Sequence, residues 1–264
     1  MRLLSAVLVF TALVGCDSQL TVREVCESNA MLCEDLNTDS HCRYERAEVI
    51  LARFYELERP DLQNKYQLLK HFEKYSKCVE LAAQIQHIKL KEKTTSRYNG
   101  YHTAQKEINR LLHETKGTNH PGLLFYHWSR NNDQDAIARL LAMENDPKVT
   151  ESQDAQFYLA SYYMKVDTDK TLHHLYRNLE LNKPDHAPNP EVLTSLVNIH
   201  YQRHDYNLAY TFAQIATLAG IENIDNTALA TQAKQAGHDT ERLDDLASTT
   251  YEQILSGTFH SPRT

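Results

Sequence analysis

The second half of the chain repeats one arrangement of apolar and aromatic residues at a spacing of 36 or 37 residues. Five positions define the arrangement, and they recur in three consecutive segments. From the last segment to the first they are Leu196, His200, Ala209, Ala213 and Ala216; Leu159, Tyr163, Leu172, Tyr176 and Leu179; and Leu123, His127, Ala136, Leu140 and Met143. Such a period is typical of solenoids of helix-turn-helix units, whose apolar faces only neighbouring units can bury. We therefore predict three units, near 118–146, 154–182 and 191–219, although ordinary helical-bundle packing also fits the spacing.

The scarcity of glycine and proline and the lack of alternation favour helices over strands in this chain. Seven glycines and seven prolines in 264 residues leave long stretches without turn formers, and these stretches alternate poorly at the period of two that strands need. The sequence therefore predicts an all-α fold. The further helices that we expect cover 43–58, 62–88, 96–114, 225–236 and 239–256. The last two would cap the stack of repeats, and the tail from Thr258 is expected to fray.

The last repeat unit carries a more specific pattern. A leucine and an aromatic residue precede an Asp-Tyr turn and two alanines, at Leu196, Tyr201, Asp205, Tyr206, Ala209 and Ala216. Residues 193–220 thereby resemble a tetratricopeptide repeat. They depart from it at Val197, which replaces the glycine of helix A, and at Ile221, where the closing proline is absent.

In tetratricopeptide proteins, one face of each A helix lines a concave groove that binds peptides or partner proteins. The resemblance implies a groove here whose wall is rich in aromatic and polar side chains. The candidate groove residues are Phe125, Trp128, Phe157, Ser161, Met164, Thr194, Asn198 and Tyr201. Aromatic and methionine side chains suit a binding surface, but they suit a packed core nearly as well.

The N-terminus has the three parts of a secretory signal: Arg2, an apolar stretch over 3–13, and a small residue before Cys16. The apolar stretch is too short to span a bilayer, which takes about 20 residues. The run Leu-Val-Gly-Cys at 13–16 resembles the lipobox of bacterial lipoproteins, which implies a lipid on Cys16 and a body that faces the periplasm. Asp17 resembles the signal for retention in the inner membrane. An ordinary cleaved signal with an incidental cysteine is the alternative.

Four cysteines follow Cys16, namely Cys26, Cys33, Cys42 and Cys78. Export to an oxidising compartment makes two disulfides the natural expectation, with three pairings to choose from. If the predicted helices 43–58 and 62–88 fold back on each other about residue 60, Cys42 and Cys78 lie side by side. This geometry favours a Cys42–Cys78 bridge that staples a helical hairpin, with Cys26–Cys33 as the second bridge. A Cys33–Cys78 pairing would contradict it.

Between these cysteines, Asp35, Asn37 and Asp39 alternate as oxygen ligands do at the start of a calcium loop. The likeness then stops, because Ser40 stands in place of the glycine at the sharp turn and Arg46 in place of the closing glutamate. A calcium-stabilised structural module is one interpretation. The other is a polar loop that caps the next helix.

No known catalytic or cofactor motif occurs, whether G-x-S-x-G, S-x-x-K, H-E-x-x-H, a P-loop or G-x-G-x-x-G. His200 and His204 have the spacing of a metal-ligand pair on a helix, but surface or interface roles are the more ordinary interpretation. The net charge is −7, and removal of Arg2 with the leader would make it −8, which disfavours nucleic acid as a partner. We expect no cofactor and no catalytic activity. Carboxylates are plentiful, so an envelope enzyme that acts on cell-wall glycan remains an alternative.

Four stretches carry a resemblance that covers residues 1–220: the lipobox, CESNAMLCEDLNTDSHCRYER at 26–46, EKYSKCVELA at 73–82 and HPGLLFYHWSR at 120–130. Together they are similar to an uncharacterised family of bacterial lipoproteins with a domain of unknown function. The resemblance implies the fold and the location but no activity. The predicted segments are a signal peptide at 1–15, a Cys-rich linker at 16–42, a helical region at 43–117, the repeats at 118–220, capping helices at 221–257 and a tail at 258–264. We expect a membrane-anchored scaffold that binds an envelope protein or peptide.

Overall fold

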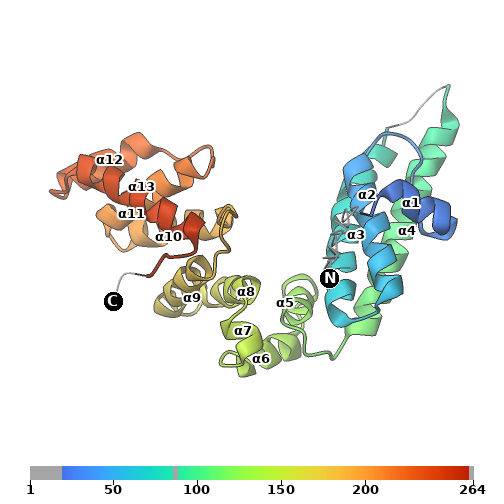
Figure 1. Cartoon of the computed structure of the whole chain (residues 1–264), viewed down its shortest axis with the longest axis horizontal. Coiled ribbons are helices and arrows are strands. Elements are labelled where there is room, and N and C mark those ends of the chain that lie inside the picture. Colours follow the sequence, from blue (N-terminus) through green and yellow to red (C-terminus); the bar gives the residue numbers. More distant parts are fainter. Residues whose placement is uncertain (1–19, 86–88, 262–264) are drawn as a thin grey trace, which may run out of the picture. The chain divides into compact units, whose positions relative to one another are not determined.

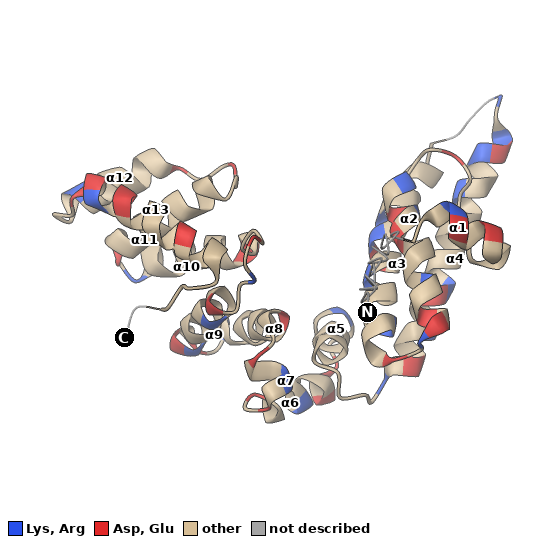
Figure 2. Ribbon diagram, in the orientation of Figure 1, with Lys and Arg blue, Asp and Glu red and all other residues tan. Residues whose placement is uncertain are grey.

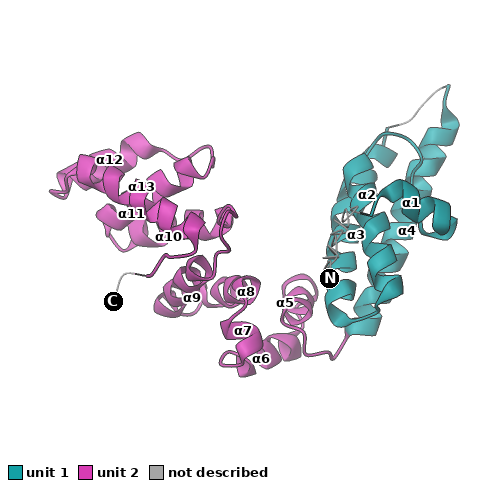
Figure 3. Cartoon of the chain, in the orientation of Figure 1, with its two compact units in different colours: residues 1–115 teal, residues 116–264 magenta. Residues whose placement is uncertain are grey.

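The computed structural model of this protein describes residues 20–85 and 89–261, and all regular secondary structure within these ranges is helical. This confirms the prediction of an all-α fold. No helix there is long and apolar enough to cross a membrane. The chain divides into two compact units, residues 1–115 and 116–264, and each is described separately below (Figure 3). Acidic and basic residues are interspersed along the helices of both units (Figure 2).

The first unit is built around three long helices (Figure 1). Its elements are α1 (Val22–Ser28), the short 3₁₀-helix η1 (Ala30–Leu32), α2 (Arg43–Glu58), α3 (Leu62–Ala83) and α4 (Lys91–Thr115). α3 packs against both α2 and α4. The core residues with no exposed surface include Ile50, Leu69, Phe72, Tyr75, Val79 and Leu111.

Helix boundaries in this unit follow capping chemistry where the sequence supplies it. Asp61 accepts a hydrogen bond from the backbone N–H of Asn64 and so fixes the start of α3 as predicted. α3 ends at Ala83 rather than at residue 88, although the apolar spacing continues. Ile85, which belongs to that spacing, is 46% exposed and therefore does not hold the helix onto the core. The short helix α1 was not predicted. Thr21 and Glu24 form a reciprocal capping box that starts it.

Both disulfides have the pairing that the hairpin geometry favoured. Cys42 bonds to Cys78 and staples the start of α2 to α3, while Cys26 bonds to Cys33 and closes a short local loop. Cys42 itself has a left-handed backbone, with φ of 55°, at the N-cap of α2. The prediction of a disulfide-stapled N-terminal helical hairpin is therefore confirmed.

The second unit contains three consecutive helical hairpins followed by two further helices. The hairpins are α5 (Pro121–Asn131) with α6 (Gln134–Ala142), α8 (Gln153–Tyr163) with α9 (Thr168–Glu180), and α10 (Pro190–Gln202) with α11 (Tyr206–Leu218). A four-residue helix, α7 (Pro147–Thr150), lies between the first two hairpins. Both α12 (Asn226–Gln235) and α13 (Thr240–Ser256) pack against α11. Proline at the first position starts α5, α7 and α10, where its missing N–H costs no helical hydrogen bond.

One continuous apolar core joins α9 to α13 in this unit. It contains Leu175, Leu196, Phe212, Ile215 and Ile254, each at most 3% exposed. Gly257 ends α13 with φ of 69°, a left-handed conformation in which glycine has no steric penalty.

The expectation that the chain frays from Thr258 is wrong for residues 258–261. Phe259 is only 4% exposed and belongs to the core of the second unit. Ser261 donates hydrogen bonds from its backbone N–H and its Oγ to Oε1 of Glu180 on α9, at 3.0 and 2.7 Å. The buried ring of Phe259 and the two hydrogen bonds of Ser261 together dock the tail.

Candidate functional site

The first two candidate groove residues begin a row of aromatic rings that crosses from α5 to α8. The ring of Phe125 stacks on Tyr158 with centroids 4.4 Å apart. Trp128 meets the edge of Tyr162 at 5.6 Å. Phe125, Trp128 and Tyr162 are all partly exposed. These rings pack between two hairpins and still keep part of their surface in solvent.

The candidates on and just after α8 have mixed roles. Phe157 is partly buried against the core of the second unit, so it contributes mainly to packing. Ser161 donates its hydroxyl to the carbonyl of Phe157 within the same helix, at 2.8 Å. Met164, which follows the helix, is 47% exposed. Of these three side chains, Met164 is the one most accessible to a partner.

The candidates on α10 lie along its solvent side. Thr194 donates its hydroxyl to the carbonyl of Pro190, Asn198 is exposed, and Tyr201 is 45% exposed. Asn198 and Met164 line a common pocket of 230 Å³ between the end of α8, the start of α9 and α10. The structure therefore brings Phe125 together with Trp128, and Met164 together with Asn198.

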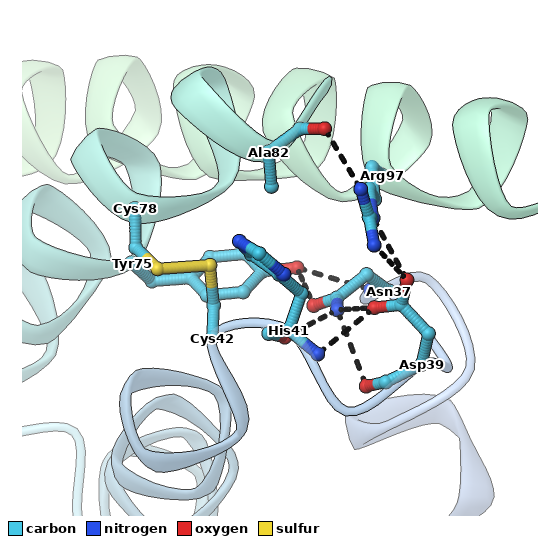
Figure 4. The surroundings of a disulfide bond; sticks show 8 residues. All are labelled: Asn37, Asp39, His41, Cys42, Tyr75, Cys78, Ala82 and Arg97. Atoms are coloured by element: carbon cyan, nitrogen blue, oxygen red, sulfur yellow. Dashed lines mark hydrogen bonds and ion pairs between the residues drawn. A yellow bond between two sulfur atoms is a disulfide. The ribbon is translucent and has the colours of Figure 1, made fainter. Parts of the chain in front are cut away.

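The three calcium candidates do not form a cation site. Asp35 binds the guanidinium of Arg53 through both carboxylate oxygens, at 2.6 and 2.9 Å. Asp39 pairs with Arg97 at 2.7 Å, and Oδ1 of Asn37 accepts the hydroxyl of Tyr75 (Figure 4). Two arginines thus pair with the two carboxylates that a calcium ion would use, which favours the interpretation as a polar loop over that of a calcium loop.

This loop instead forms a buried polar network beside the Cys42–Cys78 disulfide (Figure 4). The side-chain nitrogen Nδ2 of Asn37 donates to Oδ1 of Asp39 and to the carbonyl of His41, at 2.9 and 2.7 Å. Burial would raise the pKa of Asp39, but hydrogen bonds from Asn37 and Arg97 outweigh it and hold this pKa below its usual range. Burial raises the pKa of Tyr75 to about 12. The network is structural, because its members use their polar atoms on one another.

His200 and His204, which have the spacing of a metal-ligand pair on a helix, lie in different surroundings. His200 is buried, whereas His204 is exposed with φ of 61° and bonds to Tyr206. Among the described residues, the one group of three or more histidine, cysteine or carboxylate ligands within 4.8 Å of one another is Cys42, Glu45 and Cys78, and both of these cysteines are in the disulfide.

A second pocket, of 530 Å³, lies in the second unit at a place that the sequence did not predict. Its walls come from α9, from the end of α10 with the start of α11, and from Ser261 of the tail. The polar residues that line it are Asp169, His173, Tyr176, Arg177, Glu180, His200, Arg203, Asp205 and Ser261. Because these residues come from separate elements, the only signal in the sequence was the cluster of polar residues at 200–205.

His200 contacts two of the other polar residues that line this second pocket, Tyr176 and Asp205. Its Nε2 lies 2.8 Å from the hydroxyl of Tyr176, and its ring stacks on Phe212. Its Nδ1 lies 3.5 Å from a carboxylate oxygen of Asp205. Burial lowers the pKa of His200 and raises that of Tyr176, so both side chains are held in their neutral forms.

The fold and these surfaces define an all-helical protein in which a disulfide-stapled unit precedes a unit of consecutive helical hairpins. The chain belongs to a family described as "Protein of unknown function (DUF2989)", whose model matches residues 13–214. No curated protein and no solved structure matches the chain.

Proposed function

We propose that this protein is a lipid-anchored, periplasm-facing scaffold whose second unit binds a segment of another envelope protein. The lipid would be on Cys16, and Asp17 favours retention in the inner membrane. Both residues lie outside the described part of the chain. The support for the anchor is the lipobox-like run that ends at Cys16.

The support for a tetratricopeptide-like solenoid is the agreement between the sequence repeat and the three hairpins. Each predicted unit coincides with one hairpin, so α5, α8 and α10 are the counterparts of the A helices. In a solenoid of this kind, the A helices provide the binding face.

The observation that carries the proposal is the partial exposure of large apolar side chains along α5, α8 and α10. Phe125 and Trp128 keep part of their rings in solvent, and Met164 and Tyr201 are 47% and 45% exposed. Phe125, Trp128 and Tyr162 contact one another and form one partly exposed aromatic group, and exposed apolar patches commonly mark protein interaction sites. A pocket next to Met164 would accept one side chain of the partner.

The alternative of a glycan-cleaving enzyme has less support. Such an enzyme needs one carboxylic acid with a raised pKa as the proton donor. In the second pocket, Asp169 is paired with Arg203 at 2.6 Å. Burial would raise the pKa of Glu180, but hydrogen bonds from Ser261 and Arg177 outweigh it and hold this pKa below its usual range. Glu180 therefore lacks the raised pKa of a general acid.

Site-specific photo-crosslinking in cells tests the scaffold. A benzophenone amino acid at Met164 should give a discrete crosslinked band with one envelope protein, and the same substitution at Leu246 should not. Leu246 is a matched control because it is 48% exposed on α13, outside the candidate groove.

The Trp128→Ala/Tyr201→Ala double variant should abolish the crosslink from Met164, because the partner would lose two aromatic contacts. Identical bands from Met164 and Leu246, or a band that survives the double variant, would rule out the groove.

A further inference from the structure

The helical hairpin of α2 and α3 has an outer face whose side chains the core of the first unit does not use (Figure 1). On α2 this face is the row Tyr44, Glu48, Leu51 and Tyr55, at spacings of four, three and four residues that align side chains along a helix. Tyr44 and Tyr55 are 68% and 49% exposed, and Leu51 is partly exposed. None of the four is among the buried residues of α2. The row therefore presents apolar side chains and a carboxylate to solvent.

The neighbouring row on α3 is basic. It consists of Lys70, Lys74, Lys77 and Leu81, at the same spacings. Lys74 and Lys77 are exposed, and Leu81 is 68% exposed. A groove of 490 Å³, here called the hairpin groove, runs between the two helices, and two glutamates of α2 and two lysines of α3 line it. The hairpin groove thus has one acidic wall and one basic wall.

The opposite charges of the two walls do not pair with each other within the chain. Glu48 contacts His71 at 3.1 Å instead, and Lys77 pairs at 3.4 Å with a glutamate of its own helix. Glu45 and Lys74, which also line the hairpin groove, take part in no ion pair within the described part of the chain. Both walls therefore keep charge that a partner with the reversed arrangement of charges can compensate.

A second copy of this chain has that reversed arrangement when it is turned by 180° about an axis along the hairpin groove. The rotation places α2 of each copy over α3 of the other. The Cys42–Cys78 disulfide and the contact between Glu48 and His71 fix which residues of α2 and α3 lie at the same height. The acidic wall of each copy then faces the basic wall of the other, with Glu48 opposite Lys74.

The apolar side chains of the outer face also meet in this arrangement. Tyr44 of each copy faces Leu81 of the other, and Leu51 faces the alkyl stem of Lys70. Burial of such side chains favours association, and an interface about a two-fold axis has to be self-complementary in this way. A bilayer with anionic headgroups fits less well, because the acidic wall would be repelled by it. The outer face therefore suits a second copy better than an anionic membrane.

We propose that this protein forms a two-fold symmetric dimer through the outer face of the α2–α3 hairpin. Its contacts are Glu48 of each copy with Lys74 of the other, and Tyr44 of each copy with Leu81 of the other. The proposal goes beyond the scaffold function. It depends neither on the candidate groove of the second unit nor on the lipid anchor.

Native mass spectrometry of the full chain in a nonionic detergent tests the dimer. We expect a monomer–dimer equilibrium in which the dimer fraction rises with protein concentration. Glu48→Lys and Lys74→Glu should each raise the dissociation constant about tenfold or more, because either change places like charges opposite each other at two symmetry-related positions. Tyr44→Ser/Leu81→Ser should also weaken the dimer, because it removes the apolar contacts.

A mixture of the two charge variants distinguishes the proposed symmetry from other contacts. In a mixed dimer of a Glu48→Lys copy and a Lys74→Glu copy, every facing pair again has opposite charges. The mixed dimer should therefore form at concentrations at which neither variant pairs with itself. Isotope labelling of one variant identifies the mixed dimer by its mass.

Glu27→Lys on α1 and Lys106→Glu on α4 are the matched controls, because both side chains are exposed and neither lines the hairpin groove. Each should dimerise as the original protein does. A monomer at every concentration, charge variants that dimerise as the original does, or a mixture without mixed dimers would each overturn the proposal. A monomer that binds phosphatidylglycerol vesicles, and no longer does so after Tyr44→Ser/Leu81→Ser, would assign the outer face to a membrane instead.

Discussion

At the scale of single residues, Gly100 explains how the loop before α2 reaches the core of the first unit. The hydroxyl of Tyr75 and the backbone nitrogen of Asn37 both lie against this glycine on α4. A side chain at position 100 would collide with them. Gly100 is thus needed for the close approach of three chain segments and not for an unusual backbone conformation.

We expect Gly100→Ala to lower the free energy of unfolding of the first unit by about 1–3 kcal/mol, because the added methyl group overpacks a core with no free space. Alanine's higher helix propensity, worth about 1 kcal/mol, would otherwise favour the variant. The measurement is urea denaturation followed by far-UV circular dichroism. Asn99→Ala, on the exposed side of the same helix, should leave stability unchanged or slightly raised. A Gly100→Ala variant that is more stable than the original would show that the contact is not tight.

The buried histidines predict how stability depends on pH. Burial lowers the pKa of His174 and of His200, and His173 next to His174 adds to the effect there. The unfolded chain, in which a histidine has a pKa of about 6.5, therefore takes up protons before the folded protein does. The free energy of unfolding should fall as the pH drops below about 6.5, by at most about 1.4 kcal/mol per pH unit for each histidine.

Denaturation curves at pH 7.5 and pH 5.5, read from the fluorescence of Trp128, measure this effect in the second unit, because Trp128 is the only tryptophan in the chain. A His174→Gln/His200→Gln double variant should show a smaller decrease between these two pH values than the original protein. An equal decrease in both proteins would assign the pH dependence to other groups.

At the scale of elements, the helices could be predicted from local signals, and their ends less well. The start of α3 follows from Asp61 as a cap, whereas Cys42 at the N-cap of α2 makes no side-chain capping bond. The end of α3 at Ala83 did not follow, because the apolar spacing continues past the point where the core ends. Docking of Phe259 was unpredictable for a similar reason, since a single apolar residue in a tail has no periodicity.

The two disulfides should stabilise the first unit unequally. In the chain-entropy model, a bridge across 36 residues contributes about 4 kcal/mol, and one across 7 residues contributes about 2 kcal/mol. The Cys42→Ala/Cys78→Ala variant should therefore unfold at a lower urea concentration than the Cys26→Ala/Cys33→Ala variant. Circular dichroism without reductant measures both, and the fluorescence of Trp128 should follow an unchanged transition of the second unit. The reverse order of the two midpoints would contradict loop closure as the cause.

At the scale of the whole molecule, the lipid anchor is the feature on which the proposed location depends. Cys16→Ser should abolish labelling by radioactive palmitate and release the protein from the membrane fraction, because no other anchor is proposed. Cys26→Ser/Cys33→Ser should keep both the label and the membrane location. Asp17→Ser should move the labelled protein to the outer-membrane fraction. A Cys16→Ser protein that still carries the label would disprove the anchor.

The sequence alone determined the helical class, the three hairpins and the two disulfides, because these depend on periodicity and on distances along the chain. The tertiary structure alone decided what the polar residues do. In the sequence, Asp35 and Asp39 resemble calcium ligands. In the structure they pair with Arg53 and Arg97, which lie 18 and 58 residues away along the chain. In the sequence, His200 occupies the position of a packing residue. In the structure, Tyr176 on α9 and Asp205 at the N-cap of α11 lie beside it. Hydrogen bonds and charges act over a few ångströms in space, and one-dimensional spacing does not encode which distant side chains come that close.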